Sequence, residues 1–378
     1  MVGKKKMIRI LQVIAGMNAG GMETMIMNYY RNIDRNKIQF DFLITAKEKC
    51  FYEDEINKLG GNIYRITARN INLLKNRKEL KEFFKKNKYE IVEFHQGITY
   101  YYPLKMAKKY GVKTRIIHNH GLDRVFLKKN KIYNEIFAKR RISGLATNYF
   151  SCSEEVNDQL FSNKILKNNN IEIVPNAIDI EKYRYNYTVR EKIRKELNIE
   201  ENTKVYGHIG TFTYPKNHKF LIEIFANISQ KEKKSKLILI GNGALKSDIK
   251  REVEEKGLQE KVTFLGTRKD IDKLLSAIDC FLFPSIFEGI PLTLIEAQSN
   301  GVPVIMSDTI SEKVLINSNC KRISLEDKEK WIEESIKIKK ENEIDRIKKN
   351  ENMAQTNFNI RIQAKKLQEI YLKYAEEN

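Results

Sequence analysis

The chain of 378 residues contains little proline, cysteine or histidine, and it has no long uninterrupted apolar stretch. With 6 prolines and 18 glycines it is not a collagen-like, low-complexity or linker-dominated protein. No segment approaches the roughly 20 consecutive apolar residues that a membrane-spanning helix requires. Hydrophobic residues still make up 41% of the chain, which is enough for buried cores. At roughly 100–200 residues per domain, the length indicates two domains.

The four cysteines, Cys50, Cys152, Cys280 and Cys320, are far apart in the sequence. They form no C-x-x-C pair, and no histidine lies at zinc-finger spacing from them. We therefore expect buried, reduced thiols, with disulfides or a structural metal as the alternatives.

The amino terminus begins with basic residues and then becomes apolar, a weak indication of a secretory signal. Arg9 and Gln12 interrupt the apolar run, however, and a glycine-containing loop follows where a signal would have a small-residue cleavage site. We interpret this segment as a first β-strand and expect a soluble protein of the cytoplasm.

Acidic residues are the minority charge: 69 Lys and Arg against 49 Asp and Glu give a net charge of +20. A general richness in Lys, Asn and Ile accounts for part of it, and an anionic partner, membrane lipid or nucleic acid, is the functional explanation. Residues 75–88 mix cations with Leu80, Phe83 and Phe84, as an interfacial helix would, and residues 128–141 form a second such stretch. The alternative is two ordinary amphipathic helices with solvated cationic faces.

Short β-type runs alternate with amphipathic helical stretches from end to end, which predicts an α/β fold with parallel, doubly wound sheets. The expected strands are residues 7–14, 40–45, 62–67, 90–95, 114–118, 147–152 and 172–174, then 204–211, 236–240, 262–265, 280–283 and 303–306. Expected helices include residues 23–32, 52–59 and 73–87.

These strands form two series, each the size of one Rossmann-like domain. The polar, strand-poor segment 180–202 is the candidate connection between them. The tail from residue 328 onward is charged and helical and ends in an amphipathic stretch, 360–374. We expect two Rossmann-like domains facing across a cleft, with ligands bound by the loops that follow the carboxyl ends of the strands.

The loop after the first strand contains Gly16 and the adjacent pair Gly20 and Gly21. Adjacent glycines let a ligand approach the backbone, and the following helix start offers free N–H groups to an anion. The spacing is not the G-x-G-x-x-G dinucleotide pattern. A tight turn that serves only the fold is the alternative.

The segment after the strand at 280–283 carries the strongest pattern. Gly289 frees the loop backbone, Pro291 suits the first turn of a helix, and Gly301 suits its end. The helix start suits a phosphate. With Glu288 in the loop and Glu296 on the helix, both carboxylates can face one ligand and accept hydrogen bonds from paired sugar hydroxyls. A loop glutamate and a separate, solvated helix glutamate are the alternative.

The string FPSIFEGIPLTLIEAQSNGVPVIMSD closely resembles the donor-site signature of glycosyltransferase family 4, a group of retaining sugar transferases with the GT-B fold. The signature has two glutamates with seven residues between them, here Glu288 and Glu296. Further matches occur in the family's order: GGME near the start, VPNAID at 174–179, GTFTYPKNH, LILIGNG at 237–243 and the closing FNIRIQAKKLQEIYLKY. The resemblance covers almost the whole chain, and it is closest to bacterial enzymes that build capsular or exopolysaccharide repeat units.

The resemblance implies roles for individual residues. Glu296 would bind the ribose hydroxyls of the nucleotide, Glu288 would contact the transferred sugar as a catalytic residue, and Lys216 would neutralise the diphosphate. The implied donor-binding set is Gly20, Gly21, Thr211, Lys216, Asn242, Gly289, Ile290, Pro291, Leu292 and Glu296. Many family members have an arginine where this chain has Thr211, so the diphosphate loses one cation unless Arg268 or Lys269 replaces it.

The five histidines divide into two groups. His118 and His120 flank Asn119 at the end of a strand and would point the same way if the strand continued. The family usually has a histidine here, and the motif favours His120 as the catalytic residue, which hydrogen-bonds in the transition state. His95 and His118 are candidates for the acceptor site, and a structural pair is the alternative. His208 and His218 are interpreted as structural.

The resemblance implies a GT-B enzyme with an acceptor domain at 1–183, a donor domain at 184–355 and a closing helix at 356–378 that packs toward the first domain. It would transfer a hexose or N-acetylhexosamine from a nucleoside-diphosphate sugar, expected to be UDP-linked, to a polyprenyl-diphosphate-linked glycan or other sugar acceptor in surface polysaccharide synthesis. No metal and no cofactor are expected. The enzyme would lie peripherally on the inner face of the plasma membrane, at its anionic surface.

Other readings of the chain remain open. A nucleotide-sugar epimerase or a glycan phosphorylase of related fold would be a different enzyme class. A basic nucleic-acid-binding protein would explain the charge, but no aromatic-basic RNA motif or recognition-helix pattern is present, and we expect no nucleic-acid partner. An NAD-dependent dehydrogenase is disfavoured by the missing glycine fingerprint.

Overall fold

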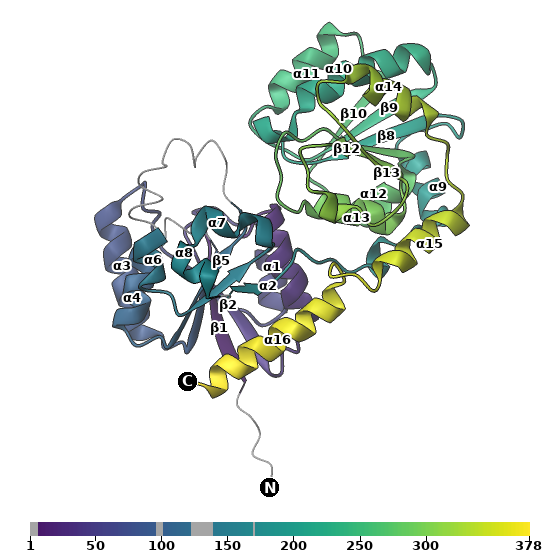
Figure 1. Ribbon diagram of the computed structural model, residues 1–378. Helices are drawn as coiled ribbons and strands as arrows, with labels where there is room; N and C mark the ends of the chain where they lie inside the picture. Colours follow the sequence, from purple (N-terminus) through teal and green to yellow (C-terminus); the bar gives the residue numbers. More distant parts are fainter. Residues whose placement is uncertain (1–6, 96–100, 122–138, 169–170) are drawn as a thin grey trace. The chain divides into compact units, whose positions relative to one another are not determined.

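The computed structural model describes residues 7–95, 101–121, 139–168 and 171–378, and the chain divides into two compact units (Figure 1). The first unit is Met1–Asn176 together with Ile360–Asn378, and the second is Ala177–Asn359. The sequence placed the boundaries after residues 183 and 355, whereas the structure places them after residues 176 and 359. Each unit is an α/β domain built on its own parallel sheet, as predicted.

The first unit contains a seven-stranded sheet in the order β3-β2-β1-β4-β5-β6-β7, with every neighbouring pair parallel. The strands are β1 (Ile8–Val13), β2 (Ile38–Ile44), β3 (Ile63–Arg65), β4 (Ile91–Phe94), β5 (Thr114–Asn119), β6 (Asn148–Ser151) and β7 (Ile171–Ile173). Even β2, next to the edge strand β3, is buried at every position, because helices cover both faces of the sheet.

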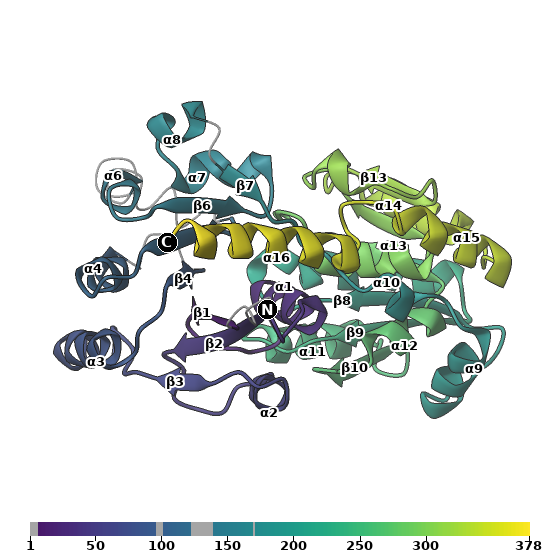
Figure 2. The ribbon, with the colours of Figure 1, turned by 90° about the horizontal axis from the view of Figure 1, so that it is seen from below.

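Two helical layers enclose this sheet. The helices are α1 (Gly21–Asn32), α2 (Glu53–Lys58), α3 (Leu73–Lys86), α4 (Tyr101–Lys109), α6 (Lys139–Ser143), α7 (Asn157–Leu160), α8 (Asn163–Lys167) and α16 (Ile360–Glu376). Figure 2 shows α3, α4 and α6 in a row on one side of the sheet, with α1 and α16 on the other.

The apolar side of α3 packs against the sheet and does not face solvent. Leu80, Phe83 and Phe84 recur at helical spacing and are buried in the core that also contains Val92 and Leu104. The prediction that these three residues contact a membrane is therefore wrong. Most of the second predicted stretch, residues 128–138, lies outside the described residues.

The carboxy-terminal helix α16 lies with the first unit and packs beside α1. The side chain of Gln368 accepts a hydrogen bond from the Asp34 backbone N–H at 2.8 Å, and Tyr371 is fully buried under the sheet. The chain thus returns to its first domain after completing the second.

The second unit contains a six-stranded parallel sheet in the order β10-β9-β8-β11-β12-β13. The strands are β8 (Lys204–Ile209), β9 (Ser235–Ile240), β10 (Val262–Gly266), β11 (Cys280–Phe283), β12 (Val304–Ser307) and β13 (Cys320–Ile323). The sequence missed β13. This edge strand reads CKRI and buries only Ile323, so it lacks the apolar run that identified the other strands.

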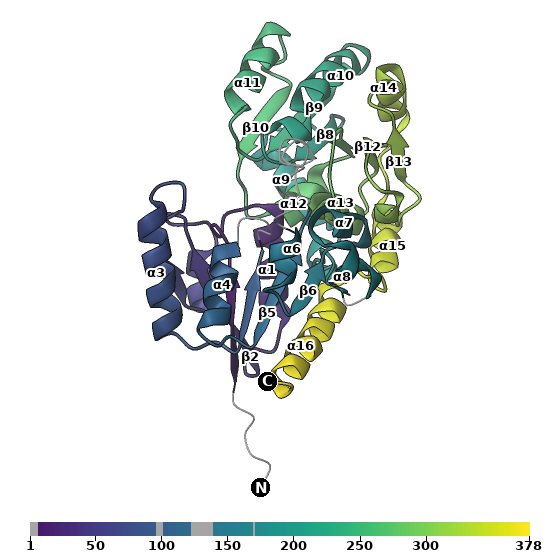
Figure 3. The same ribbon diagram turned by 60° about the vertical axis from the view of Figure 1, so that its left-hand side comes forward.

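Helices again cover both faces of the second sheet. They are α9 (Tyr187–Glu196), α10 (His218–Lys231), α11 (Lys246–Glu255), α12 (Ile271–Ala277), α13 (Leu292–Asn300), α14 (Lys328–Lys337) and α15 (Glu343–Met353), with short 3-10 turns η4 (Glu181–Tyr183), η5 (Tyr214–Lys216) and η6 (Glu312–Val314). Figure 3 shows α10, α11 and α14 on one face and α9, α12, α13 and α15 on the other.

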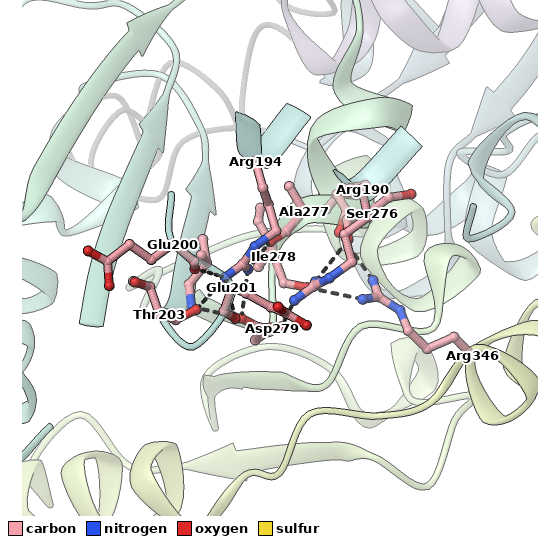
Figure 4. A network of polar contacts seen from close by, with 12 residues as sticks. Arg190, Arg194, Glu200, Glu201, Thr203, Ser276, Ala277, Ile278, Asp279 and Arg346 are labelled. Carbon is pink, nitrogen blue, oxygen red and sulfur yellow. Dashed lines mark hydrogen bonds and ion pairs between the residues drawn. The ribbon is translucent and has the colours of Figure 1, made fainter. Parts of the chain in front are cut away.

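The segment 180–202, which the sequence suggested as the connection between domains, lies wholly within the second unit. Its helix α9 is held by two buried arginines whose guanidinium groups converge on Asp279 (Figure 4). Arg190 Nη2 lies 2.7 Å from Asp279 Oδ1, and Arg194 Nη1 lies 3.3 Å from Oδ2. Arg346 of α15 joins the cluster by donating to the backbone carbonyl of Ile278 at 3.1 Å. The prediction of a connecting segment was wrong because it took the polar composition as a sign of exposure, whereas Arg190 and Arg194 are buried inside the second unit.

All four cysteines lie among the described residues and are free thiols; Cys50, Cys152 and Cys280 are buried, and Cys320 is partly exposed. The expectation of buried thiols is met by Cys50, Cys152 and Cys280 but not by Cys320. Among the helices that the structure describes, none combines the length and the apolar character needed to cross a bilayer.

The Asp279 cluster predicts a large effect on stability. Asp279→Asn leaves Arg190 and Arg194 buried without a counter-charge, so the free energy of unfolding of the second unit should fall by about 3–5 kcal/mol. Urea denaturation followed by tryptophan fluorescence measures this directly, because Trp331 is the single tryptophan of the chain and is buried in the second unit.

The matched control is Asp248→Asn, which removes an exposed ion pair with Arg251 and should cost less than about 1 kcal/mol. Equal losses in the two variants would contradict a stabilising role for the buried cluster.

Candidate functional site

The loops that follow β8 and β11 meet at the carboxyl edge of the second sheet. Lys216, in the turn η5 after β8, forms an ion pair with Glu288, in the loop after β11, with Nζ and Oε1 2.5 Å apart. The strands β8 and β11 are neighbours in the sheet, which is why loops far apart in sequence come together here. Two residues predicted to serve the donor site are thus in direct contact.

The side chain of Lys216 lies in a slot that a glycine makes possible. A Cβ atom on Gly210 would stand 3.0 Å from Nε2 of His208, 3.2 Å from Cδ and 3.4 Å from Cε of Lys216, so a larger residue would require both side chains to shift slightly. On another side, Lys216 Nζ lies 4.9 Å from the centre of the Phe283 ring, within the range of a cation–π contact. The ammonium group therefore has a defined position.

The loop after β9 lies directly against this slot. Gly241 has a positive φ of 141°, and a Cβ atom there would overlap the carbonyl oxygen of Gly210. Phe212 N–H donates to the backbone oxygen of Asn242 at 3.1 Å. The glycines of the LILIGNG string therefore let the two loops stack, which brings exposed Asn242 beside exposed Thr211.

The helix α13 begins as the sequence predicts. Pro291 is its N-terminal cap residue with φ −75°, and Leu292 is its first helical residue. The first N–H groups of any α-helix lack intrahelical acceptors and attract anions. A Cβ atom on Gly289 would meet nothing within 4 Å, so the space beside this loop is open, and the neighbouring Ile290 is half-buried. At the other end Gly301, with φ 77°, stops the helix.

Glu296, unlike Glu288, is a buried carboxylate. Glu296 is only 5% exposed, because its helix α13 is packed between α12 and α15. Burial raises the pKa of Glu296, and the hydroxyl of Tyr183 donates to Oε1 at 2.7 Å and partly offsets this shift. Each glutamate therefore has a partner within the protein, Lys216 for Glu288 and Tyr183 for Glu296.

Tyr183 is a site residue that the sequence analysis missed. It lies in η4, in the segment that was interpreted as a connection, and Asn300 Nδ2 donates to its backbone oxygen at 3.0 Å. The only signal was the apolar spacing of Ile180 and Tyr183 within an otherwise polar stretch.

Arg268, one candidate replacement for the missing arginine at Thr211, is paired within the protein. Arg268 follows β10 and directs Nε and Nη2 to the two carboxylate oxygens of Asp270, at 2.8 and 2.7 Å. Hydrogen bonding to Asp270 raises the pKa of Arg268. Recruiting this side chain to a phosphate would mean breaking that pair.

The predicted histidines cluster at the carboxyl edge of the first sheet and form a hydrogen-bonded chain. His95 Nε2 lies 2.5 Å from Gln12 Oε1, and His95 Nδ1 lies 2.9 Å from His120 Nε2. An amide oxygen only accepts, so His95 carries its proton on Nε2 and accepts at Nδ1 from His120 Nε2–H. His120 is thereby left with Nδ1 as its unprotonated nitrogen.

His118 belongs to a second, more deeply buried chain. Its Nδ1 lies 2.7 Å from Glu93 Oε1, and the other oxygen of Glu93 accepts from the hydroxyl of Tyr371 on α16. Burial raises the pKa of Glu93 and lowers that of His118 to about 3. The carboxy-terminal helix therefore supports the histidine cluster through a single buried carboxylate.

Three histidines can in principle hold a metal ion, and one ring nitrogen from each of His95, His118 and His120 lies within 4.8 Å of the others. Nitrogens bound to one tetrahedral zinc lie roughly 3.3 Å apart, given Zn–N distances of about 2.0–2.1 Å. Here one pair is at hydrogen-bond distance, and the rings of His118 and His120 are stacked at 4.1 Å with an angle of 24° between their planes. This arrangement fits a hydrogen-bonded chain better than a shared metal.

The glycine pair of the first unit lies at the start of α1, with Gly20 as cap residue and Gly21 as the first helical residue. The carboxylate of Glu23 folds back over this start, where a Cβ atom on Gly20 would overlap it. Burial raises the pKa of Glu23. An anion at these N–H groups would therefore meet an acidic side chain of the protein itself.

Comparison with known families matches both units of the chain. The model for "Glycosyltransferase Family 4" matches residues 19–182, and the model for "Glycosyl transferases group 1" matches residues 189–359. EpsF of Bacillus subtilis, which is named as a glycosyltransferase, is 33% identical over 310 residues, covering 81% of this chain and 80% of that protein.

A second relative carries a more specific name. The Escherichia coli UDP-Gal:alpha-D-GlcNAc-diphosphoundecaprenol alpha-1,3-galactosyltransferase is 27% identical, covering 88% of this chain and 89% of that protein. Among solved structures, Anabaena Alr3699/HepE in complex with UDP and glucose superimposes with a TM-score of 0.78 at 16% identity, covering 97% of this chain and all of that one. At this identity the likeness concerns the fold.

Histidine titration tests the electrostatics of both units. Burial lowers the pKa of all five histidines, to about 4 for His218 and about 3 for His118. Below pH 6.5 the unfolded chain takes up protons that the folded chain does not, so the stability contributed by each neutral histidine is lost as the pH falls. The free energy of unfolding should decrease by up to about 1.4 kcal/mol per histidine per pH unit between pH 6.5 and 4.5.

NMR of the imidazole C–H resonances checks the same point residue by residue. No histidine should titrate between pH 8 and pH 5.5 in the folded protein. A resonance with a midpoint near pH 6.5 would contradict the buried, neutral assignment for that residue.

Proposed function

The chain belongs to glycosyltransferase family 4 and is a glycosyltransferase, and from that premise we propose that it transfers a sugar from a UDP-sugar to a lipid-linked glycan with retention of anomeric configuration. The sugar is a hexose or an N-acetylhexosamine, and the product enters a surface polysaccharide. The observation that carries the proposal is the Lys216–Glu288 ion pair beside the start of α13.

The ion pair provides a site that a diphosphate can enter by exchange. Lys216 already holds an anion, the carboxylate of Glu288, in the slot made by Gly210. A nucleoside diphosphate carries more charge than one carboxylate, so it would replace Glu288 as the partner of Lys216. The released Glu288 would then accept hydrogen bonds from hydroxyls of the transferred sugar.

Catalysis in this scheme is mainly electrostatic. Negative charge grows on the diphosphate as the bond between the sugar and the phosphate oxygen breaks, and fixed positive groups stabilise that charge. Lys216 supplies one, and the backbone N–H groups from Gly289 to Leu292 at the start of α13 supply others. The acceptor hydroxyl forms the new bond on the same face, and its proton passes to the departing phosphate, so that configuration is retained and no divalent metal is required.

The buried Glu296 suits the ribose of the donor. Tyr183 engages Oε1 and fixes the rotation of the carboxylate, which leaves Oε2 as the oxygen that would accept from a ribose hydroxyl. Asn300 in turn fixes the backbone of Tyr183. A carboxylate positioned in this way loses little side-chain entropy on binding, which favours affinity.

The first unit supplies the acceptor side of the proposal. His120, with its proton held on Nε2 by His95, presents Nδ1 as an acceptor for a hydroxyl near the reacting sugar. The other two histidines, His95 and His118, shape the acceptor site. A lipid-diphosphate-linked acceptor is supported by the E. coli relative, whose name specifies a UDP-sugar donor and a diphosphoundecaprenol-linked acceptor. An acceptor of this kind would place the enzyme on the inner face of the plasma membrane.

If the donor binds by replacing Glu288, substitutions of the two partners of the ion pair should have opposite effects on the affinity for UDP. Lys216→Ala should weaken UDP binding about 10–100-fold, because one charge-assisted contact is lost. Glu288→Gln should instead tighten UDP binding about threefold or more, since it removes the competing and repelling carboxylate, while transfer of the sugar slows. Isothermal titration with UDP measures both affinities.

Lys256→Ala is the control for the loss of a positive charge, because this lysine is exposed at the end of α11. Its UDP affinity should match that of the wild type. Equal weakening in the Lys216 and Lys256 variants, or weakening in Glu288→Gln, would contradict the exchange.

The proposed role of His120 predicts that its substitution changes the turnover number more than the affinity for the donor. His120→Ala should lower kcat about 100-fold while KM for the UDP-sugar changes less than about threefold, because its contact is made in the transition state. His120→Gln keeps an acceptor atom and should recover part of kcat. Parallel changes in kcat and KM, or unchanged turnover, would remove this residue from the mechanism.

A further inference from the structure

Exposed apolar side chains gather at one point of the first unit. Eight large hydrophobic residues of the described chain are exposed, and three of them fall within four consecutive positions: Ile71 at 67%, Leu73 at 41% and Leu74 at 78%. Single exposed hydrophobics are normal on soluble surfaces, whereas a group of them marks an interaction site. We call residues 71–74 the apolar tip.

The apolar tip is held in place by the surrounding structure. Asn72 caps α3 by accepting from Lys75 N–H at 2.9 Å, and Asn76 Nδ2 donates to Thr67 O at 2.7 Å. Glu79 accepts from Thr67 N–H at 2.6 Å. These bonds tie the loop before α3 to the helix itself, so the exposure of the tip is built into a folded turn.

A strongly cationic helix face continues from the tip. Residues 69–88 contain eight Lys and Arg against two Glu, a net charge of +6. The eight cations are all exposed: Arg69, Lys75, Arg77, Lys78, Lys81, Lys85, Lys86 and Lys88. Of the two acids, Glu79 turns toward Thr67, which leaves Glu82 as the exposed acid of this stretch. The charge therefore faces solvent on the side of α3 opposite to its buried apolar side.

The tip also lies at the functional edge of its sheet. It follows β3, and in a parallel sheet the loops after all strands lie at the same edge. His95 follows β4 and His120 follows β5, so the apolar tip and the histidine cluster share this edge.

We propose that the apolar tip inserts into the interfacial region of an anionic lipid bilayer while the cations of α3 bind the lipid headgroups. Apolar side chains next to a row of cations are complementary to such a surface, which is apolar below and negatively charged above. The inserted residues are Ile71, Leu73 and Leu74, in place of the buried Leu80, Phe83 and Phe84 that the sequence suggested. This deepens the proposed function, since it would deliver a lipid-linked acceptor to the edge that holds the histidines.

Vesicle co-sedimentation tests the proposal with the full chain. The wild type should bind phosphatidylcholine vesicles that contain phosphatidylglycerol and should bind pure phosphatidylcholine vesicles weakly. The double variant Ile71→Asn/Leu74→Asn should lower the partition coefficient about tenfold or more, and so should Lys81→Glu/Lys85→Glu. The matched control is Ile344→Asn, which removes an equally exposed hydrophobic (66%) from the second unit and should bind as the wild type does.

The outcomes separate this proposal from the proposed function. The tip variant should retain the affinity for UDP and the transfer to a short-chain, water-soluble acceptor, whereas Lys216→Ala should lose affinity for UDP and still bind vesicles. Unchanged vesicle binding by the tip variant would overturn the proposal. A wild type that binds neither kind of vesicle would also overturn the proposal. If the tip variant then abolished self-association in sedimentation, the apolar tip would be a contact with a second copy of the chain.

Discussion

The ion pair between Lys216 and Glu288 is the interaction on which the proposed binding of the donor depends. It joins the loops after two neighbouring strands, and Gly210 leaves room for the stem of Lys216. Without an anionic ligand, a lone lysine at this edge would be costly to desolvate, and Glu288 compensates it. In the proposed exchange the diphosphate would replace this carboxylate, so the site would be folded and charge-balanced before the diphosphate binds.

In each unit a tyrosine hydroxyl also holds a buried carboxylate at the carboxyl edge of the sheet. In the second unit Tyr183 donates to Glu296, and in the first Tyr371 donates to Glu93, which in turn orders His118. In both cases burial raises the pKa of the carboxyl group, and the tyrosine comes from a segment distant in sequence. These contacts link the packing of the tyrosine's segment to the geometry of the sheet edge. If the tyrosine moved away, the buried carboxyl group would lose its hydrogen-bond donor, which costs free energy.

Much of the architecture was predictable because it rests on local signals. Twelve strands followed from apolar runs, and the bounds of α13 followed from Pro291 and Gly301, whereas the half-exposed edge strand β13 carries no such run. The partners of the site residues were not predictable, since the pairing of Glu296 with Tyr183 depends on how α13 packs. Charged residues misled the prediction twice: Arg190, which is buried, made a packed helix look like a linker, and the exposed cations near Phe84 made a core face look like a membrane face.

A structure of the protein with a bound UDP-sugar tests the central claim most directly. The account predicts that the diphosphate lies within hydrogen-bond distance of Lys216 Nζ, that Glu288 has left the lysine and contacts the sugar, and that a ribose hydroxyl donates to Glu296 while Tyr183 still holds its other oxygen. A nucleotide bound elsewhere, with the Lys216–Glu288 pair intact at 2.5 Å, would contradict it.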